Sequence, residues 1–224
     1  MPGNAPRNKL EATASLGAEI VKVGPASEER RLRAEELAAK HGYAIVPPYD
    51  DEKIIAGQGT AGLEILEDLP EVETVLVPVG GGGLISGIAA ALKLSKRSVK
   101  VIGVEPELAG DAHASFRAGH IVSFEAEQVT QTLADGLRTQ SIGALNFEHI
   151  KAYVDDMVTV NEDEIRRATA ALSSNPKTTA EPSGAVSVAG FLFHANDLPK
   201  TNFNVAVISG GNIDPRLLEE MRQA

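Results

Sequence analysis

The chain has 224 residues, a net charge of −10 and no cysteine. This length allows one large domain or two small ones, the negative charge argues against nucleic acids and anionic membrane surfaces as partners, and the missing cysteines exclude disulfides, thiolate zinc sites and a cysteine nucleophile. Because we find neither a leader segment nor an apolar run long enough to span a membrane, we expect a cytoplasmic protein.

Helical and strand patterns alternate along the chain, which favours an α/β fold with a parallel sheet. The first part is predicted to form helix, strand, helix and strand over residues 9–16, 18–23, 27–40 and 43–46. We expect Ser27 to cap the second helix and the run Glu28-Glu29-Arg30-Arg31 to be a solvated helix face. The segment Pro47-Pro48-Tyr49-Asp50-Asp51 is the best candidate for a boundary between two domains.

After this boundary, the sequence predicts a helix over residues 59–66, a strand over 74–79 and a helix from 84 to about 93. Further strands are predicted over residues 99–104 and 205–208. The most informative stretch is the loop between the predicted strand over 74–79 and the helix that follows it, because this loop consists of four consecutive glycines, Gly80 to Gly83.

Four glycines leave the backbone bare, so that successive N–H groups can turn toward one point. The N-terminus of the following helix adds a partial positive charge at that point. The loop lacks the Lys-Ser/Thr ending of a P-loop, so we interpret it as a backbone site for the phosphate of a bound cofactor. A tight turn is the alternative, although two glycines would suffice for a turn.

Five other motifs accompany the tetraglycine loop in a fixed order along the chain. They are Ile55-Ala-Gly-Gln-Gly-Thr60, Gly103-Val-Glu-Pro106, Ala134-Asp-Gly136, Glu181-Pro-Ser-Gly-Ala185 and Ile208-Ser-Gly-Gly-Asn212. Each is weak alone, but together they make the chain resemble the serine/threonine dehydratase (threonine ammonia-lyase) and serine racemase family, almost from Met1 to Asn212. These are pyridoxal-phosphate enzymes of the tryptophan synthase β-like fold, also called fold type II.

The resemblance implies a three-layer α/β fold with a parallel sheet. Residues 1–46 would be the C-terminal part of a small domain, and residues 47–224 a large domain that binds pyridoxal 5′-phosphate. In that domain Gly80, Gly81, Gly82, Gly83 and the N–H of Leu84 would hold the cofactor phosphate.

The resemblance also places Ser209 at the pyridine nitrogen of the cofactor. A hydroxyl there leaves this nitrogen largely unprotonated, which weakens the electron sink and favours β-elimination. An ordinary turn serine is the alternative. Glu181 would lie near the cofactor, or it could equally serve the end of a helix.

Glu105, Ala109 and Asp111 match the family's cation site, which uses two carboxylates and one backbone carbonyl. Hard oxygen ligands of this kind suit Mg²⁺ or Ca²⁺. The alternative is that these are surface acids near the end of a strand.

Two family segments do not occur in this sequence: Ser-Phe-Lys-x-Arg-Gly, which carries the Schiff-base lysine, and Gly-Asn-His, which contacts the cofactor ring. Met1 therefore resembles an internal methionine of a longer parent, and we expect a fold that is incomplete at the N-terminus. A truncated sequence, a split enzyme and a decayed or repurposed fragment are the competing explanations. No catalytic residue is assigned, and we expect this chain alone to be inactive.

By resemblance, the parent reaction is the β-elimination of L-threonine or L-serine to 2-oxobutanoate or pyruvate plus ammonia. The expected partners are the amino-acid substrate and either a second copy in a homodimer or a complementing N-terminal segment. The Pro-Tyr-Asp-Asp motif favours dehydratases over racemases and cysteine synthase-like enzymes. A non-catalytic cofactor-binding or interaction fragment, and a serine racemase-like or 3-hydroxyaspartate dehydratase-like enzyme, are the alternatives.

Overall fold

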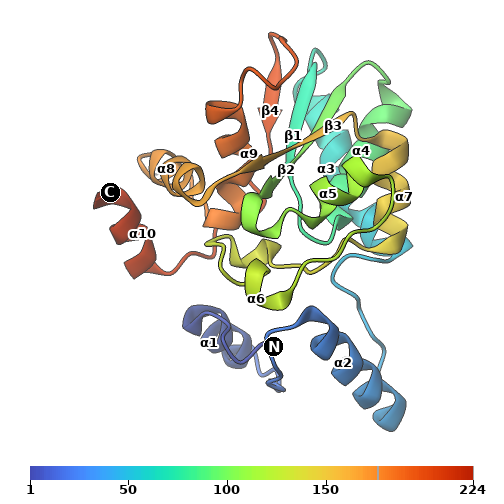
Figure 1. Cartoon of the computed structure of the whole chain (residues 1–224), viewed down its shortest axis with the longest axis vertical. Coiled ribbons are helices and arrows are strands. Elements are labelled where there is room, and N and C mark those ends of the chain that lie inside the picture. Colours follow the sequence, from blue (N-terminus) through green and yellow to red (C-terminus); the bar gives the residue numbers. More distant parts are fainter. Residues whose placement is uncertain (176, 224) are drawn as a thin grey trace.

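A computed structural model describes residues 1–175 and 177–223, and a parallel sheet lies at its centre (Figure 1). Four strands form this sheet in the order β3-β2-β1-β4. They are β1 (Thr74–Pro78), β2 (Lys100–Pro106), β3 (Asp156–Val160) and β4 (Asn204–Ala206). The α/β class that the sequence pattern predicts is therefore confirmed.

Helices cover both faces of the sheet, which gives the three expected layers (Figure 1). On one side lie α3 (Glu52–Asp68), α4 (Gly83–Ser95), α5 (Asp111–Ala118) and α7 (Ala144–Tyr153). On the other side lie α8 (Glu162–Ser173) and α9 (Pro182–Phe193), with α10 (Pro215–Gln223) packed against α8. Short helical turns occur at η1 (Glu107–Ala109), α6 (Ala126–Val129) and η2 (Asp135–Leu137).

The central strand β1 contributes side chains to two separate cores. Val75 and Val77 pack under α4 and α7, whereas Leu76 packs under α8 and α9. Successive residues of a strand point to opposite faces of a sheet, so a strand with helices on both sides must be apolar throughout. This requirement explains the continuous run of buried residues that leads into the tetraglycine loop.

Residues 1–46 form α1 (Arg7–Ser15) and α2 (Ser27–His41), which lie together at one end of the molecule, away from the sheet (Figure 1). The strands predicted over 18–23 and 43–46 are wrong. Both segments are irregular, apart from one bridge between Pro2 and Val23. A strand needs a neighbouring strand for its backbone hydrogen bonds. Residues 1–3 pair with 21–23 over this single bridge only, and the described residues place no strand beside 43–46.

Two helix starts also differ from the prediction. Ser27 is the first residue of α2 rather than its cap, and its N–H and hydroxyl donate to Gln140 Oε1 at 3.2 and 3.4 Å. Helix α3 begins seven residues before the predicted start at 59, because the carboxylate of Asp51 accepts hydrogen bonds from the N–H groups of Lys53 and Ile54. Within the described part of the chain, every helix is too short or too polar to cross a lipid bilayer.

Candidate functional site

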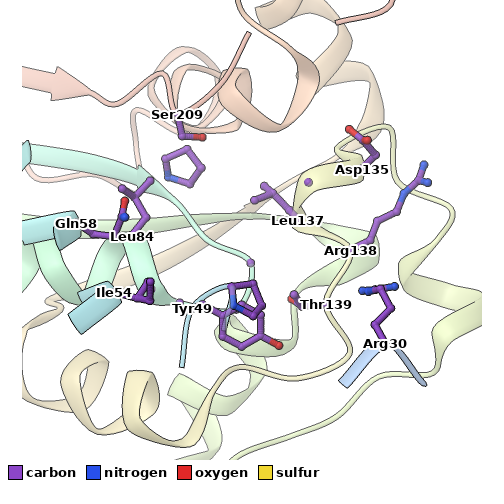
Figure 2. Close-up of a pocket in the computed structure, with 17 residues that line it drawn as sticks. Arg30, Tyr49, Ile54, Gln58, Leu84, Asp135, Leu137, Arg138, Thr139 and Ser209 are labelled. Atoms are coloured by element: carbon purple, nitrogen blue, oxygen red, sulfur yellow. The ribbon is translucent and has the colours of Figure 1, made fainter. Parts of the chain in front are cut away.

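A cavity of about 390 Å³ opens beyond the C-terminal ends of β1 and β4. Ligands of open parallel sheets bind at this edge, outside the carboxyl ends of the strands. Figure 2 shows that widely separated segments of the chain supply the cavity wall. The polar and charged side chains in this wall are those of Arg30, Tyr49, Gln58, Asp135, Arg138, Thr139 and Ser209.

The tetraglycine loop and the first turn of α4 line this cavity with backbone N–H groups. The N–H groups of Gly81, Gly82, Gly83 and Leu84 have no acceptor among the described residues, although the three glycines are buried. A buried N–H without an acceptor costs free energy, so these donors favour a ligand that accepts hydrogen bonds. The N-terminus of α4, a helix of 13 residues, adds a partial positive charge. Together these features fit an anion such as a phosphate group.

The loop needs glycine for two separate reasons. Gly82 has a φ of +94°, in the left-handed region that side chains disfavour. A Cβ atom at Gly82 would also lie 2.9 Å from Cβ of Asn146, and one at Gly81 would overlap the ring of Tyr49. The side chains of Tyr49 and Asn146 therefore occupy the space that a Cβ at residues 81 and 82 would need, and the N–H groups of the loop remain without an acceptor among the described residues.

Ser209 follows β4 and forms part of the same cavity wall (Figure 2). It is exposed, and its hydroxyl makes no hydrogen bond with any described residue. The structure thus brings together the glycine loop and Ser209, which are about 125 residues apart in the sequence and were predicted to share one site. The Ser209 hydroxyl is available to a ligand in the cavity.

Glu181, in contrast, does not line the cavity. It is the N-cap residue of α9, its N–H donates to the carbonyl of Gly210 at 3.0 Å, and its carboxylate lies 3.2 Å from Nζ of Lys9. Lys9 also pairs with Asp135 at 2.8 Å. Burial lowers the pKa of Lys9, but the hydrogen bonds and charges of Asp135 and Glu181 outweigh it and raise this pKa. Lys9 is therefore a charged structural contact, and none of the described residues that line the cavity is a lysine.

The predicted cation ligands Glu105 and Asp111 are both fully buried, which excludes the alternative that they are surface acids. Glu105 accepts hydrogen bonds from the N–H groups of Ala112 and His113 at 3.3 and 2.6 Å. Asp111 accepts one from Thr139 at 3.5 Å through Oδ1, and its Oδ2 has no hydrogen-bond partner among the described residues.

Burial raises the pKa of Asp111 to about 7, and burial together with the charge of Asp111 raises the pKa of Glu105. Two buried carboxylates, one with an unpartnered oxygen, have the chemistry of a divalent-cation site. Among the described residues no third His, Cys, Asp or Glu joins them, so a further protein ligand would be a neutral oxygen, such as a backbone carbonyl or a hydroxyl. The buried Ala109, in η1 between these two acids, is the predicted source.

Two arginines of the cavity wall were not predicted from the sequence. Arg30 on α2 and Arg138 after η2 lie in the wall, on the opposite side from Gln58 and Leu84 (Figure 2). Arg138 donates to the carbonyl of Thr132 at 3.0 and 2.6 Å, and Arg30 to that of Pro25 at 2.9 Å. The interpretation of the Glu28-Glu29-Arg30-Arg31 run as a solvated face is therefore wrong for Arg30. Only the nearby Ala134-Asp-Gly136 motif could have pointed to Arg138.

A profile of the family described as pyridoxal-phosphate dependent enzyme matches residues 1–210 of the chain. The chain belongs to this family. The resemblance inferred from the order of the motifs is thus confirmed, and so is the three-layer architecture of fold type II. The free N–H groups of the tetraglycine loop fit the phosphate of the family's cofactor.

Among curated proteins, this family member is 46% identical over 222 residues to an L-threonine ammonia-lyase of Thermotoga maritima, which corresponds to 99% of the chain and 54% of that relative. Among solved structures, it is similar to a threonine deaminase of T.th., with 41% identity, a TM-score of 0.86, and coverage of 96% of this chain and 69% of that one. It is also similar to a maize serine racemase, with 33% identity, a TM-score of 0.89, and coverage of 98% and 67%. The chain spans about half the length of the Thermotoga relative.

Proposed function

We propose that the chain is the cofactor-binding part of an ammonia-lyase that uses pyridoxal 5′-phosphate to convert L-threonine or L-serine into 2-oxobutanoate or pyruvate plus ammonia. One observation carries this proposal. A single cavity at the C-terminal edge of the sheet combines the free N–H groups of the tetraglycine loop with the unpaired hydroxyl of Ser209. When bound, the cofactor supplies an electron sink for the negative charge that forms at the substrate α-carbon.

The residues of the chain have separate tasks in this proposal. The N–H groups of Gly80 to Leu84 bind the cofactor phosphate, and the Ser209 hydroxyl orients the ring at its nitrogen. Arg30 and Arg138 attract the carboxylate of the amino acid, because a guanidinium pairs well with a carboxylate. Glu181 acts outside the cavity, where its N–H holds Gly210 next to Ser209.

We also propose that Mg²⁺ or Ca²⁺ binds between Glu105, Asp111 and the carbonyl of Ala109. The cation compensates two carboxylates that burial otherwise disfavours in their charged form. The site lies beside the cavity, because Thr139 contacts Asp111 and also lines the cavity wall. The cation then stabilises that part of the wall.

The remaining assignments are proposals about organisation. Residues 1–46 belong to a small domain and residues 47–224 to a large one. The cavity lacks a lysine among its described lining residues, so the amine that removes the α-proton would come from a complementing N-terminal segment. A homodimer is the other proposed assembly. The cytoplasm remains the predicted location.

A second candidate function is that of a binding module without catalysis. The same observation favours it, since the described cavity lining holds phosphate donors but no lysine. Such a module would bind the cofactor noncovalently and release no product.

Two measurements on the purified chain test both candidates. Equilibrium dialysis with pyridoxal 5′-phosphate is expected to show one bound cofactor per chain, and failure to bind would overturn both candidates. With L-threonine or L-serine added, we expect no keto acid from the chain alone. Release of 2-oxobutanoate or pyruvate would disprove its inactivity, and activity that appears only with an added N-terminal segment would support the lyase over the binding module.

A further inference from the structure

The carbonyl oxygen of Gly81 is held from behind by two donors. The side-chain amide of Asn146 donates to it through Nδ2 at 2.8 Å, and the N–H of Gly143 donates at 3.1 Å. Asn146 is fully buried on α7. The opposite orientation of its amide would place Oδ1 against the Gly81 carbonyl, acceptor against acceptor, so the chemistry fixes Nδ2 as the donor.

This pair of hydrogen bonds determines the direction of the next N–H group. The peptide unit between Gly81 and Gly82 is planar, and its C=O and N–H point in opposite directions. Because the Gly81 carbonyl points toward α7, the N–H of Gly82 points away from α7, on the side where the cavity lies. That N–H has no acceptor among the described residues.

Asp50 in turn holds the first turn of α7. Its carboxylate accepts hydrogen bonds from the N–H groups of Ala144, Leu145 and Asn146 at 3.2, 2.9 and 3.3 Å. A carboxylate at a helix N-terminus is favourable because of the free donors and the partial positive charge there. Asp50 lies in the segment that sequence analysis treated as a domain boundary, about 95 residues from α7.

The two polar atoms of the Asn146 side-chain amide differ: Nδ2 donates a hydrogen bond, whereas Oδ1 accepts none within the described part of the chain. Its Oδ1 is buried and has no hydrogen-bond partner among the described residues. A buried acceptor without a donor is unfavourable, and an apolar side chain of similar size would avoid that cost. The hydrogen bond from Nδ2 to the Gly81 carbonyl is therefore the interaction that distinguishes asparagine from an apolar residue at this position.

We propose that Asn146, held by Asp50, is a positioning residue that directs the Gly82 N–H at the cofactor phosphate. This inference rests on the proposed function, since it assumes that the tetraglycine loop binds that phosphate. Asn146 touches neither cofactor nor substrate and acts through the backbone of Gly81.

The test compares the binding of pyridoxine 5′-phosphate and pyridoxine to the purified chain. Both carry an alcohol in place of the cofactor's aldehyde, so neither reacts with surface lysines. The dissociation constant of pyridoxine divided by that of pyridoxine 5′-phosphate therefore reports only on the phosphate. In Asn146→Leu, which keeps the size of the side chain and removes the donor, we expect this ratio to fall about tenfold or more. Binding of pyridoxine is expected to change little.

Two further variants complete the experiment. Asp50→Ala alters an exposed side chain and is expected to lower the ratio several-fold without loss of the fold. Asn161→Ala removes the capping box of α8, on the opposite face of the sheet, and serves as the control. It is expected to lower the unfolding temperature and leave the ratio unchanged.

The outcomes separate this inference from the proposed function. An unchanged ratio in Asn146→Leu, or an equal fall in Asn161→Ala, would overturn the role of Asn146 and leave the proposed function intact. A wild-type chain that does not prefer the phosphate ester would overturn the proposed function and this inference with it.

Discussion

Nζ of Lys9, on α1, lies 2.8 Å from the carboxylate of Asp135 in the cavity wall. The same ammonium group lies 3.2 Å from Glu181, and all three side chains are largely shielded from water. The nearby Asn8 amide donates to the carbonyl of Asn212 at 3.3 Å. Side-chain contacts therefore connect α1 to η2, through Asp135, and to the segment after Ser209, through Asn212.

We expect Lys9→Met to loosen these contacts, because it leaves two partly buried carboxylates without their cation. The predicted loss is about 1–3 kcal/mol of unfolding free energy in urea. Faster amide hydrogen exchange in α1 is expected, with little change in β1. Lys22→Met, at an exposed position, is the matched control and is predicted to stay within about 0.5 kcal/mol of wild type. Equal effects of the two variants would contradict the assignment.

Gly82→Ala is expected to abolish detectable binding of pyridoxine 5′-phosphate and to cost about 2–4 kcal/mol of stability, from backbone strain plus a clash with Asn146. Gly119→Ala is a suitable control, since Gly119 has a φ of +74° but no atom within 4 Å of an added Cβ. It should cost only about 1–2 kcal/mol and leave binding intact. Titration calorimetry and urea unfolding measure both quantities, and retained binding in Gly82→Ala would be inconsistent with the site.

The pH dependence of stability is expected to follow Asp111. Burial raises its pKa to about 7, whereas an unfolded aspartate titrates near pH 4, so the folded chain keeps a proton that the unfolded chain releases. Its contribution is fully present below about pH 4 and is lost as the pH rises toward 7, by up to about 4 kcal/mol. The raised pKa of Glu105 acts in the same direction.

Urea unfolding at pH 5 and pH 8 measures this dependence. We expect Asp111→Asn to reduce the loss of stability between the two values. Ca²⁺ or Mg²⁺ should stabilise the wild type more at pH 8 than at pH 5, because the cation binds the charged carboxylates. If wild type and Asp111→Asn show the same pH dependence, Asp111 does not titrate in this range.

Ser209 offers a test of ring contact without a stability effect. Its side chain is exposed and has no partner among the described residues, so Ser209→Ala is predicted to change the unfolding free energy by less than about 0.5 kcal/mol. Binding of pyridoxine 5′-phosphate should weaken about 2- to 10-fold. With Ser209→Asp, the absorbance of the bound ligand should shift to the form protonated on the ring nitrogen. An unchanged spectrum would place the ring nitrogen elsewhere.

The sheet core and the backbone of the tetraglycine loop were predictable because the evidence for them is local. A continuous apolar run indicates a strand that is buried on both faces, and the predicted strand over 74–79 matches β1 closely. The four glycines that follow indicate a loop with a backbone conformation that other residues disfavour. The predicted strand over 99–104 overlaps most of β2, and the predicted helix lies within α4. The Ser209 segment was placed through the order of the motifs, and β4 ends two residues earlier than expected.

The errors concern features that depend on distant residues. The segments 18–23 and 43–46 have apolar residues typical of strands, but a strand forms only beside a partner strand. The edge strand β3 was missed because Asp156 and Thr159 interrupt its apolar residues. Arg30 lies in a charged helix whose contact with the cavity comes from tertiary packing, and Asp50 meets α7 across about 95 residues of sequence. No local pattern reveals such contacts.

The anchoring of adjacent residues Asp50 and Asp51 has a mechanical consequence. The carboxylate of Asp50 binds the first turn of α7 and that of Asp51 binds the first turn of α3, so the chain is attached to two helices of the sheet layer at this point. The exposed stretch 42–46, which begins at a glycine with a φ of +71°, precedes these attachments. A rotation of the N-terminal helices about this stretch would have to break the contacts of Lys9 with Asp135 and of Ser27 with Gln140. The tetraglycine loop would keep its shape during such a rotation while Arg30, carried on α2, changed its distance to the cavity.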